Sequence, residues 1–269
     1  MRHVVVVLIL LAFGALKLPF ERRLAEEHQK AFFHGAKLNL DLRQQIGQLG
    51  FLAALSGFRA MVADLLWIEA HSAWERTEWG KMQLLFNDVT ALQPRNLTFW
   101  DMAAWHMAWN ASHAALEDPK QPREALRIKK AREFYDIGKD FVERGIANNP
   151  DRYLLYERLG FLLQQKYNDH CGAAEAYRKA VSFPDAPEYL HRFVAYELSH
   201  CPGREREAYE LLVSYYKRGE REWLPTLLSR LAYLQEKLNV PPDERVYNPP
   251  AKEKEKEPKQ EPQKNEPAK

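Results

Sequence analysis

Residues 157–184 read "ERLGFLLQQKYNDHCGAAEAYRKAVSFP", and this stretch decides the fold. It contains two amphipathic helices separated by a short polar turn, and Pro184 prevents the second helix from continuing. The pattern places small residues where two helices must approach each other and a large ring where the space between helix pairs must be filled. The positions that carry this pattern are Leu159, Gly160, Ala173, Tyr177 and Ala180. The stretch therefore predicts a closely packed helical hairpin.

The same order returns at a fixed spacing along the chain. Pro150 and Pro184 are 34 residues apart, which is the period of the tetratricopeptide repeat. Between them, bulky-x-x-Leu-Gly on the first helix precedes Ala-x-x-x-Tyr-x-x-Ala on the second. The chain resembles the tetratricopeptide family in this order of residues. The resemblance implies an all-α superhelix of stacked helix pairs, a solenoid whose concave face is lined by first helices and holds a peptide or another protein.

Three weaker copies flank this one. In the copy after Pro94 the second helix is delayed by an insertion of roughly 22 residues, which contains "EDPKQPREALRIKK". One copy precedes Pro94, another pair follows Pro184, and a leucine-rich helix over 224–238 is suited to closing the stack. The matching positions before Pro150 are Trp67, Ala70, Trp74, Met82, Phe86, Val89, Trp100, Ala103, Ala104, Met107, Gly138, Val142 and Gly145.

The resemblance also implies which side chains face the concave side. They are Trp105 and Trp109 in the second copy, and Phe161, Gln164 and Gln165 at the matching places of the third. Aromatic anchors in a hollow surface concentrate binding energy, so we expect Trp105 and Trp109 to be partly exposed there. Trp67, Trp74 and Trp100 are expected to fill the core, as aromatic residues at helical spacing usually do.

The first twenty residues, 1–20, differ in kind from the rest of the chain. Arg2 precedes an apolar run, and a helix over residues 4–20 would be about 25 Å long, at the short end for a bilayer core. A cleavable secretory signal and a buried core helix are the alternatives to an uncleaved transmembrane anchor. We expect a single-pass protein of the inner membrane of a bacterial-type cell, with its folded body on the periplasmic side.

The rest of the chain divides into three parts. Residues 21–59 are predicted to form a helical stalk and a leading helix, and residues 60–240 the repeat domain. The apolar stretch 41–70 is expected to be a long helix packed against the first repeat, since Arg59 would be costly in a second membrane span. Residues 241–269 are rich in Pro, Lys and Glu and are predicted to be a disordered tail.

The two cysteines, Cys171 and Cys201, each follow a histidine and lie in the predicted turns of neighbouring copies. Equivalent points of stacked repeats lie about 10 Å apart, farther than the Cα separation that a disulfide needs. A longer "HCPG" turn could close the gap, so a disulfide, two free thiols and a metal site that includes His170 and His200 all remain open.

His106 and His113 flank Trp109, seven residues apart. This spacing predicts that both imidazoles lie on one face of a helix, packed in a tryptophan-rich seam rather than bound to a metal.

Composition and motifs exclude several classes of function. The chain has 46% hydrophobic residues, 28% charged residues and a net charge of +2, which argues against a nucleic-acid partner. It contains no P-loop, GxGxxG, HExxH or GxSxG motif, and so indicates no cofactor and no enzyme activity. These features favour a non-enzymatic, membrane-tethered scaffold in a cell-envelope complex. A metal-dependent hydrolase that uses the His/Cys edge, and a self-assembling structural subunit, are the alternatives.

Overall fold

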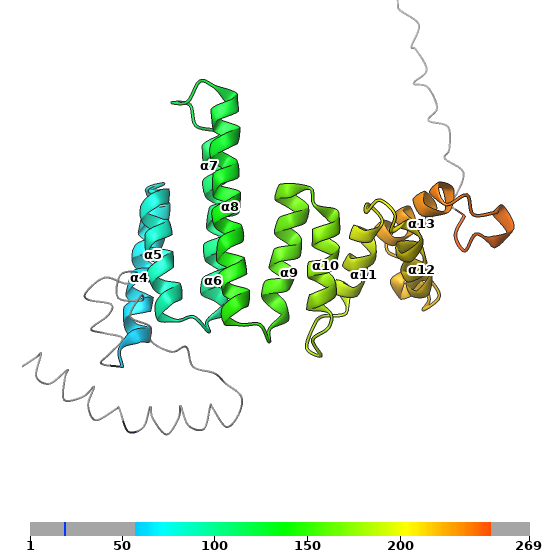
Figure 1. Ribbon diagram of the computed structural model, residues 1–269, viewed down its shortest axis with the longest axis horizontal. Helices are drawn as coiled ribbons and strands as arrows, with labels where there is room; N and C mark the ends of the chain where they lie inside the picture. Colours follow the sequence, from blue (N-terminus) through cyan, green and yellow to red (C-terminus); the bar gives the residue numbers. More distant parts are fainter. Residues whose placement is uncertain (1–18, 20–56, 249–269) are drawn as a thin grey trace, which may run out of the picture.

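The computed structural model describes residues 57–248 and the isolated Pro19 (Figure 1). The predicted anchor, the stalk before residue 57 and the chain after residue 248 lie outside the described residues. Within residues 57–248 all regular structure is helical and there is no strand, which confirms the all-α prediction. No helix within the described part has both the length and the apolar character that crossing a bilayer requires.

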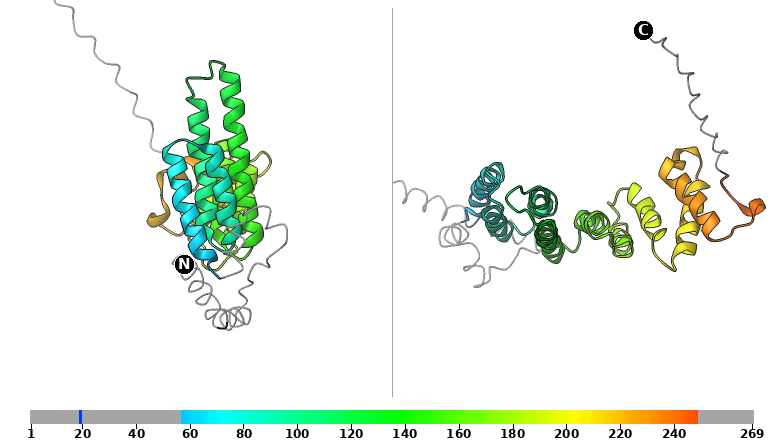
Figure 2. Two further views of the ribbon diagram at one scale, coloured as in Figure 1. Left: turned by 90° about the vertical axis from the view of Figure 1, so that its left-hand side faces the viewer. Right: turned by 90° about the horizontal axis from the view of Figure 1, so that it is seen from above.

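The helices form successive antiparallel pairs arranged in a row (Figures 1 and 2). In the first pair, α4 (Arg59–Glu75) packs with α5 (Trp79–Leu92). In the second pair, the first helix consists of α6 (Leu97–Trp105), η1 (His106–Ala111) and α7 (Ser112–Leu116), and the second helix is α8 (Glu124–Asn148). The next two pairs are α9 (Tyr153–Leu162) and η2 (Leu163–Tyr167) with α10 (His170–Ala180), and α11 (Tyr189–Leu198) with α12 (Glu205–Tyr216). The short η3 (Glu220–Glu222), α13 (Pro225–Lys237) and η4 (Pro242–Glu244) follow.

Small residues set the helix spacing, as the sequence predicts. A Cβ on Gly160 would lie 2.8 Å from the ring of Tyr177, which is itself 1% exposed. In the preceding pair, a Cβ on Gly138 would lie 2.7 Å from the Cβ of Ala108. Both glycines therefore allow the two helices of a pair to approach more closely than any side chain would permit.

Hydrogen bonds at the turns join consecutive pairs. The carbonyl oxygen of Pro94 accepts bonds from the indole Nε1 of Trp100 and the side-chain amide of Asn149, both at 2.9 Å. Arg95 reaches the same turn and pairs with Asp151 at 3.1 Å. The turn before the second pair is therefore bonded directly to the turn after it, which fixes the position of α9 relative to α6.

Most of the insertion in the second copy is helical, and only residues 117–123 separate the two helices. Helix α8 begins at Glu124 and continues without a break to Asn148, while η1 and α7 extend α6 to Leu116. The extra residues lengthen both helices into a hairpin that projects beyond its neighbours (Figure 1). The prediction that the whole of "EDPKQPREALRIKK" precedes the second helix is wrong, because α8 begins within it. Lys, Arg, Glu and Ala dominate this stretch and all favour helix.

The two ends of the described body differ from expectation. Gly57 has φ +80° and α4 begins only at Arg59, so the stretch 41–70 is not one continuous helix. At the other end, residues 241–248 pack back onto α13. The side chain of Gln235, 1% exposed, donates to the carbonyl oxygen of Tyr247 and accepts from the backbone N–H groups of Val246 and Tyr247. The ordered body therefore continues beyond the predicted boundary at 240.

Candidate partner-binding cleft and the disulfide edge

A cleft of about 260 Å³ opens between the first helices of the second and third pairs. Its walls come from α6, η1 and α9, with one residue from α8 at its base. The residues that line it are Asp101, Met102, Ala104, Trp105, Trp109, Val142, Arg158, Phe161 and Leu162. Three of the five residues predicted to face a partner therefore lie together in one hollow. Gln164 and Gln165 are not among them.

A stack of three parallel rings forms the aromatic wall of the cleft. The rings of Trp105 and Trp109 are 4.7 Å apart with planes 8° from parallel, and those of Trp109 and Phe161 are 5.4 Å apart and 6° from parallel. Trp105 is 42% exposed, whereas Trp109 and Phe161 are half-buried. Offset stacking holds the rings in place, so the exposed face of Trp105 is a rigid apolar surface.

Two π-helical turns lie at matching positions of the first helices. Segment η1 follows Trp105, and η2 begins two residues after Phe161, the residue that occupies the same repeat position. A π-turn widens the helix by one residue and turns the side chains that follow it away from α-helical register. Trp109 lies inside η1. Its ring stacks on Trp105 of the same pair and on Phe161 of the next pair. Such turns are frequent at functional sites.

Charged groups lie at the rim of the cleft. Asp101 of α6 pairs with Arg158 of α9 at 2.8 Å, which closes one side. Lys166 is not among the lining residues, but its Nζ lies 4.9 Å from the ring centre of Trp109 and 5.1 Å from that of Tyr135. Burial lowers the pKa of Lys166 from its ordinary value. These charged residues are not among the side chains predicted to face a partner. Their spacing from Trp105 and Phe161 on the same helices is the signal that could have found them.

The two predicted glutamines have different roles. The amide Nε2 of Gln164 donates to the carboxylate of Glu197 at 2.7 Å, and Gln165 is exposed. Gln164 of η2 therefore contributes a hydrogen bond to α11, and Glu157 of α9 contributes a second by accepting from the Tyr189 hydroxyl at 2.7 Å. These bonds set the angle between the third and fourth pairs and do not point into the cleft.

His106 and His113 do not share a face. His106 is 9% exposed and packs between the rings of Trp74 and Phe86, while His113 is exposed. The π-turn over 106–111 separates them, because the spacing of seven residues that aligns side chains on an α-helix does not do so across η1. The predicted common face is wrong, although the predicted packing of His106 among tryptophan and other rings is found. Burial lowers the pKa of His106.

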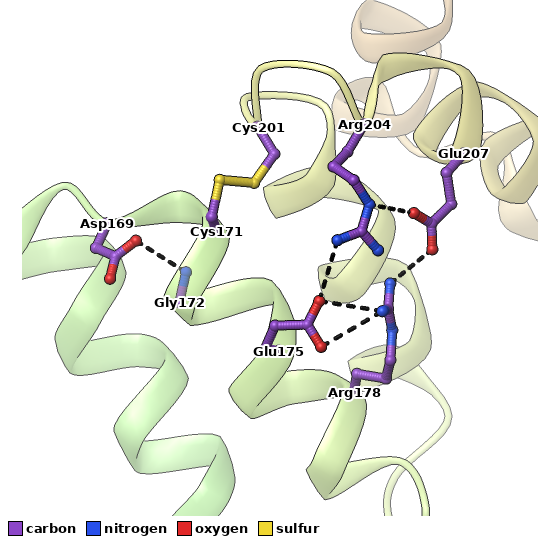
Figure 3. A network of polar contacts seen from close by, with 8 residues as sticks. All are labelled: Asp169, Cys171, Gly172, Glu175, Arg178, Cys201, Arg204 and Glu207. Atoms are coloured by element: carbon purple, nitrogen blue, oxygen red, sulfur yellow. Dashed lines mark hydrogen bonds and ion pairs between the residues drawn. A yellow bond between two sulfur atoms is a disulfide. The ribbon is translucent and has the colours of Figure 1, made fainter.

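Cys171 and Cys201 are joined by a disulfide with Cα atoms 5.3 Å apart (Figure 3). This separation is about half of the spacing expected for equivalent points of stacked repeats, because the turn before α12 bends toward α10. Arg204 in that turn pairs with Glu207 at 2.5 Å and with Glu175 of α10 at 3.3 Å. Ion pairs and a covalent bond therefore hold the same two elements together.

Two imidazoles lie beside the disulfide. His170 donates from Nδ1 to Glu197 at 2.7 Å, and its ring stacks on that of His200 at 4.2 Å. Burial lowers the pKa of His200 to about 4, and it raises the pKa of Glu197. The two sulfurs are bonded to each other and so offer no thiolate to a metal. Among the residues that the structure describes, no group of three or more His, Cys, Asp or Glu side chains is arranged to hold a metal ion.

No protein-family model, no curated protein and no solved structure matches this chain. The likeness to tetratricopeptide repeats therefore depends on the residues of the repeat and on the helix pairs that they form.

Proposed function

We propose that this protein is a non-enzymatic scaffold of tetratricopeptide-like helix pairs, wound into a solenoid, which holds a peptide or protein segment against the aromatic stack of Trp105, Trp109 and Phe161. The observation that carries the proposal is the exposed face of Trp105 at the open end of that stack, in a cleft of about 260 Å³. A flat ring kept rigid by its neighbours binds at little entropic cost, and such residues dominate binding energy at interfaces.

The cleft favours a partner with an apolar anchor. Most of its lining is apolar, and its carboxylate and guanidinium, Asp101 and Arg158, are already paired with each other. An apolar side chain would displace water from Trp105 and Met102 without leaving either charge without its counter-ion. Polar backbone groups of the partner would meet Arg158 and Asp101 at the rim, which restricts how an extended segment can lie.

The proposal also includes a membrane tether at residues 4–20 and a body on the periplasmic side. The apolar run and the disulfide support it, because disulfides persist in oxidising compartments. A tether raises the local concentration of a membrane-bound partner, so a modest affinity in the cleft is sufficient. Protease treatment of intact spheroplasts tests this arrangement: the body should be digested from outside, and protection of the body would contradict it.

The cleft is tested by Trp105→Ala against Trp223→Ala in the full chain. Trp223 is a matched control because it is 40% exposed and also stacks on one ring, Tyr216, but lies outside the cleft. A displayed library of random peptides selects a ligand for the full chain, and that peptide is then titrated against each variant. We expect Trp105→Ala to weaken binding about tenfold or more, as for a hot-spot residue, and Trp223→Ala to change it less than about twofold.

Circular dichroism of both variants shows whether helix content is kept. Equal affinities of the two folded variants would reject the cleft as the binding site. Selection of no peptide by the folded wild-type chain would reject peptide binding itself.

A further inference from the structure

The two cysteines of the disulfide differ in exposure to solvent. Cys171 is exposed, whereas Cys201, in the turn that leads into α12, is 2% exposed. A thiol in solution must approach one sulfur in line with the bond that it breaks. The exposed residue, Cys171, is the side of the bond that faces solvent, so we expect an exchange reaction at this disulfide to have a defined direction.

Cys171 is also the better placed of the two to exist as a thiolate. It is the second residue of α10, an eleven-residue helix (His170–Ala180), where unpaired backbone N–H groups and the helix dipole favour negative charge. Cysteines at helix N-termini have lowered thiol pKa values for this reason. The carboxylate of Asp169, which caps the helix through the N–H of Gly172 at 2.8 Å, opposes the effect in part.

The disulfide is not the only connection between the elements that it joins. Arg178 of α10 pairs with Glu207 of α12 at 2.7 Å, and Arg204 connects to both Glu175 and Glu207 (Figure 3). In addition, His170 of α10 is hydrogen-bonded to Glu197 of α11. These contacts keep α10 and the turn before α12 together when the covalent bond is open, so the bond can open and close without unpacking the helices.

We propose that the Cys171–Cys201 disulfide is a thiol–disulfide exchange site, entered at Cys171, whose redox partner is a dithiol protein. The partner's thiolate attacks Sγ of Cys171 and forms a mixed disulfide, and the electron pair of the broken bond passes to Sγ of Cys201, which takes up a proton. The partner's second thiol then attacks its own sulfur in the mixed disulfide and releases Cys171 as a thiolate. The partner ends as a disulfide, and this chain has gained two electrons.

The full wild-type chain tests the direction of attack. The protein is exposed to limiting reduced glutathione, quenched in acid and digested, and mixed disulfides are located by mass spectrometry. Glutathione should be found on Cys171 in at least about tenfold excess over Cys201. Equal occupancy, an excess on Cys201, or a disulfide that opens only in denaturant would overturn the proposal. The proposal is independent of the aromatic cleft, which stands or fails on the titration of Trp105→Ala.

Single-cysteine variants give a second measurement. Cys201→Ser leaves Cys171 as the free thiol, and Cys171→Ser leaves Cys201. Alkylation by iodoacetamide should be at least about tenfold faster in Cys201→Ser, and its pH dependence should give a thiol pKa below the ordinary value of about 8.5. Both variants should react alike in denaturant. Similar rates in the folded variants, or a pKa at or above the ordinary value, would show that neither helix α10 nor exposure distinguishes Cys171.

Discussion

At the scale of single residues, Gly160 packs so closely against the ring of Tyr177 that an added Cβ would lie 2.8 Å from it. We expect Gly160→Ala to lower the free energy of unfolding by about 1–3 kcal/mol, because a Cβ at 2.8 Å from that ring forces the helices apart. Gly80→Ala is the matched control, since nothing lies within 4 Å of its added Cβ. Urea unfolding measures both. A Gly160→Ala protein as stable as Gly80→Ala would show that the pair tolerates wider spacing.

His200 should make stability depend on pH. Burial is the main cause that lowers its pKa to about 4, with added repulsion from Arg230, His170 and Lys237. The unfolded chain takes up a proton near pH 6.5, whereas folded His200 stays neutral until about pH 4. Stability that is present above the unfolded pKa is therefore lost as the pH falls through this window.

His200→Gln should reduce that loss. We compare the change in urea midpoint between about pH 7 and about pH 5, the range over which the His200 contribution changes. The three proteins are wild type, His200→Gln and His113→Gln, a control at another exposed histidine. The change should be smallest in His200→Gln and the same in the other two. Glu197, whose pKa burial raises, acts in the opposite direction, but it is present in all three proteins. Identical pH profiles would contradict the assignment.

At the scale of elements, the sequence predicts what depends on local chemistry. The helix ends at Pro150 and Pro184 can be predicted because proline stops a helix in any protein. The Gly160–Tyr177 contact can be predicted because a large ring packs against a helix only where a small residue leaves room for it. The π-turns η1 and η2 are not visible, because one extra residue in a turn leaves the apolar pattern almost unchanged. The sequence therefore finds the rings of the cleft but not the turn that brings them together.

The predicted C-terminal boundary of the body at residue 240 is wrong because it depends on a contact that the local sequence does not show. Pro241 and Pro242 end a helix, but they do not prevent the next residues from packing on it. Val246 and Tyr247 supply the apolar contact, and the buried amide of Gln235 supplies the hydrogen bonds. A tail is disordered where it has no apolar side chains to bury. Val246 and Tyr247 are apolar side chains that this segment can bury.

Gln235→Leu tests the element that closes the row of helices. The substitution removes one hydrogen bond to a carbonyl oxygen and leaves the N–H groups of Val246 and Tyr247 without their acceptor. We expect a loss of about 1–3 kcal/mol, typical of a buried polar group deprived of its partner. Gln165→Leu, at an exposed glutamine, should change stability by less than about 0.5 kcal/mol. Equal effects in thermal unfolding would mean that residues 241–248 do not stabilise α13.

At the scale of the whole molecule, each helix pair packs mainly on its neighbours in the row. Stability in such an arrangement is close to a sum of pair and interface contributions, so a local change stays local. Two separate large clusters of buried side chains reflect this: one centres on Trp100 and Phe141, and the other on Tyr177 and Leu212. The aromatic cleft lies between the second and third pairs, whereas the disulfide joins the third pair to the fourth.

Removal of the disulfide tests this locality. The bond closes a loop of 30 residues, and its loss in Cys171→Ser/Cys201→Ser should lower stability by about 3–4 kcal/mol through the entropy of the unfolded chain. Hydrogen exchange should show faster exchange in α10, α11 and α12, while α4 and α5 keep wild-type protection because no contact with the lost bond reaches them. Wild-type protein in a dithiol reductant should reproduce the pattern. Faster exchange spread evenly over all helices would instead show that the row unfolds as one cooperative unit.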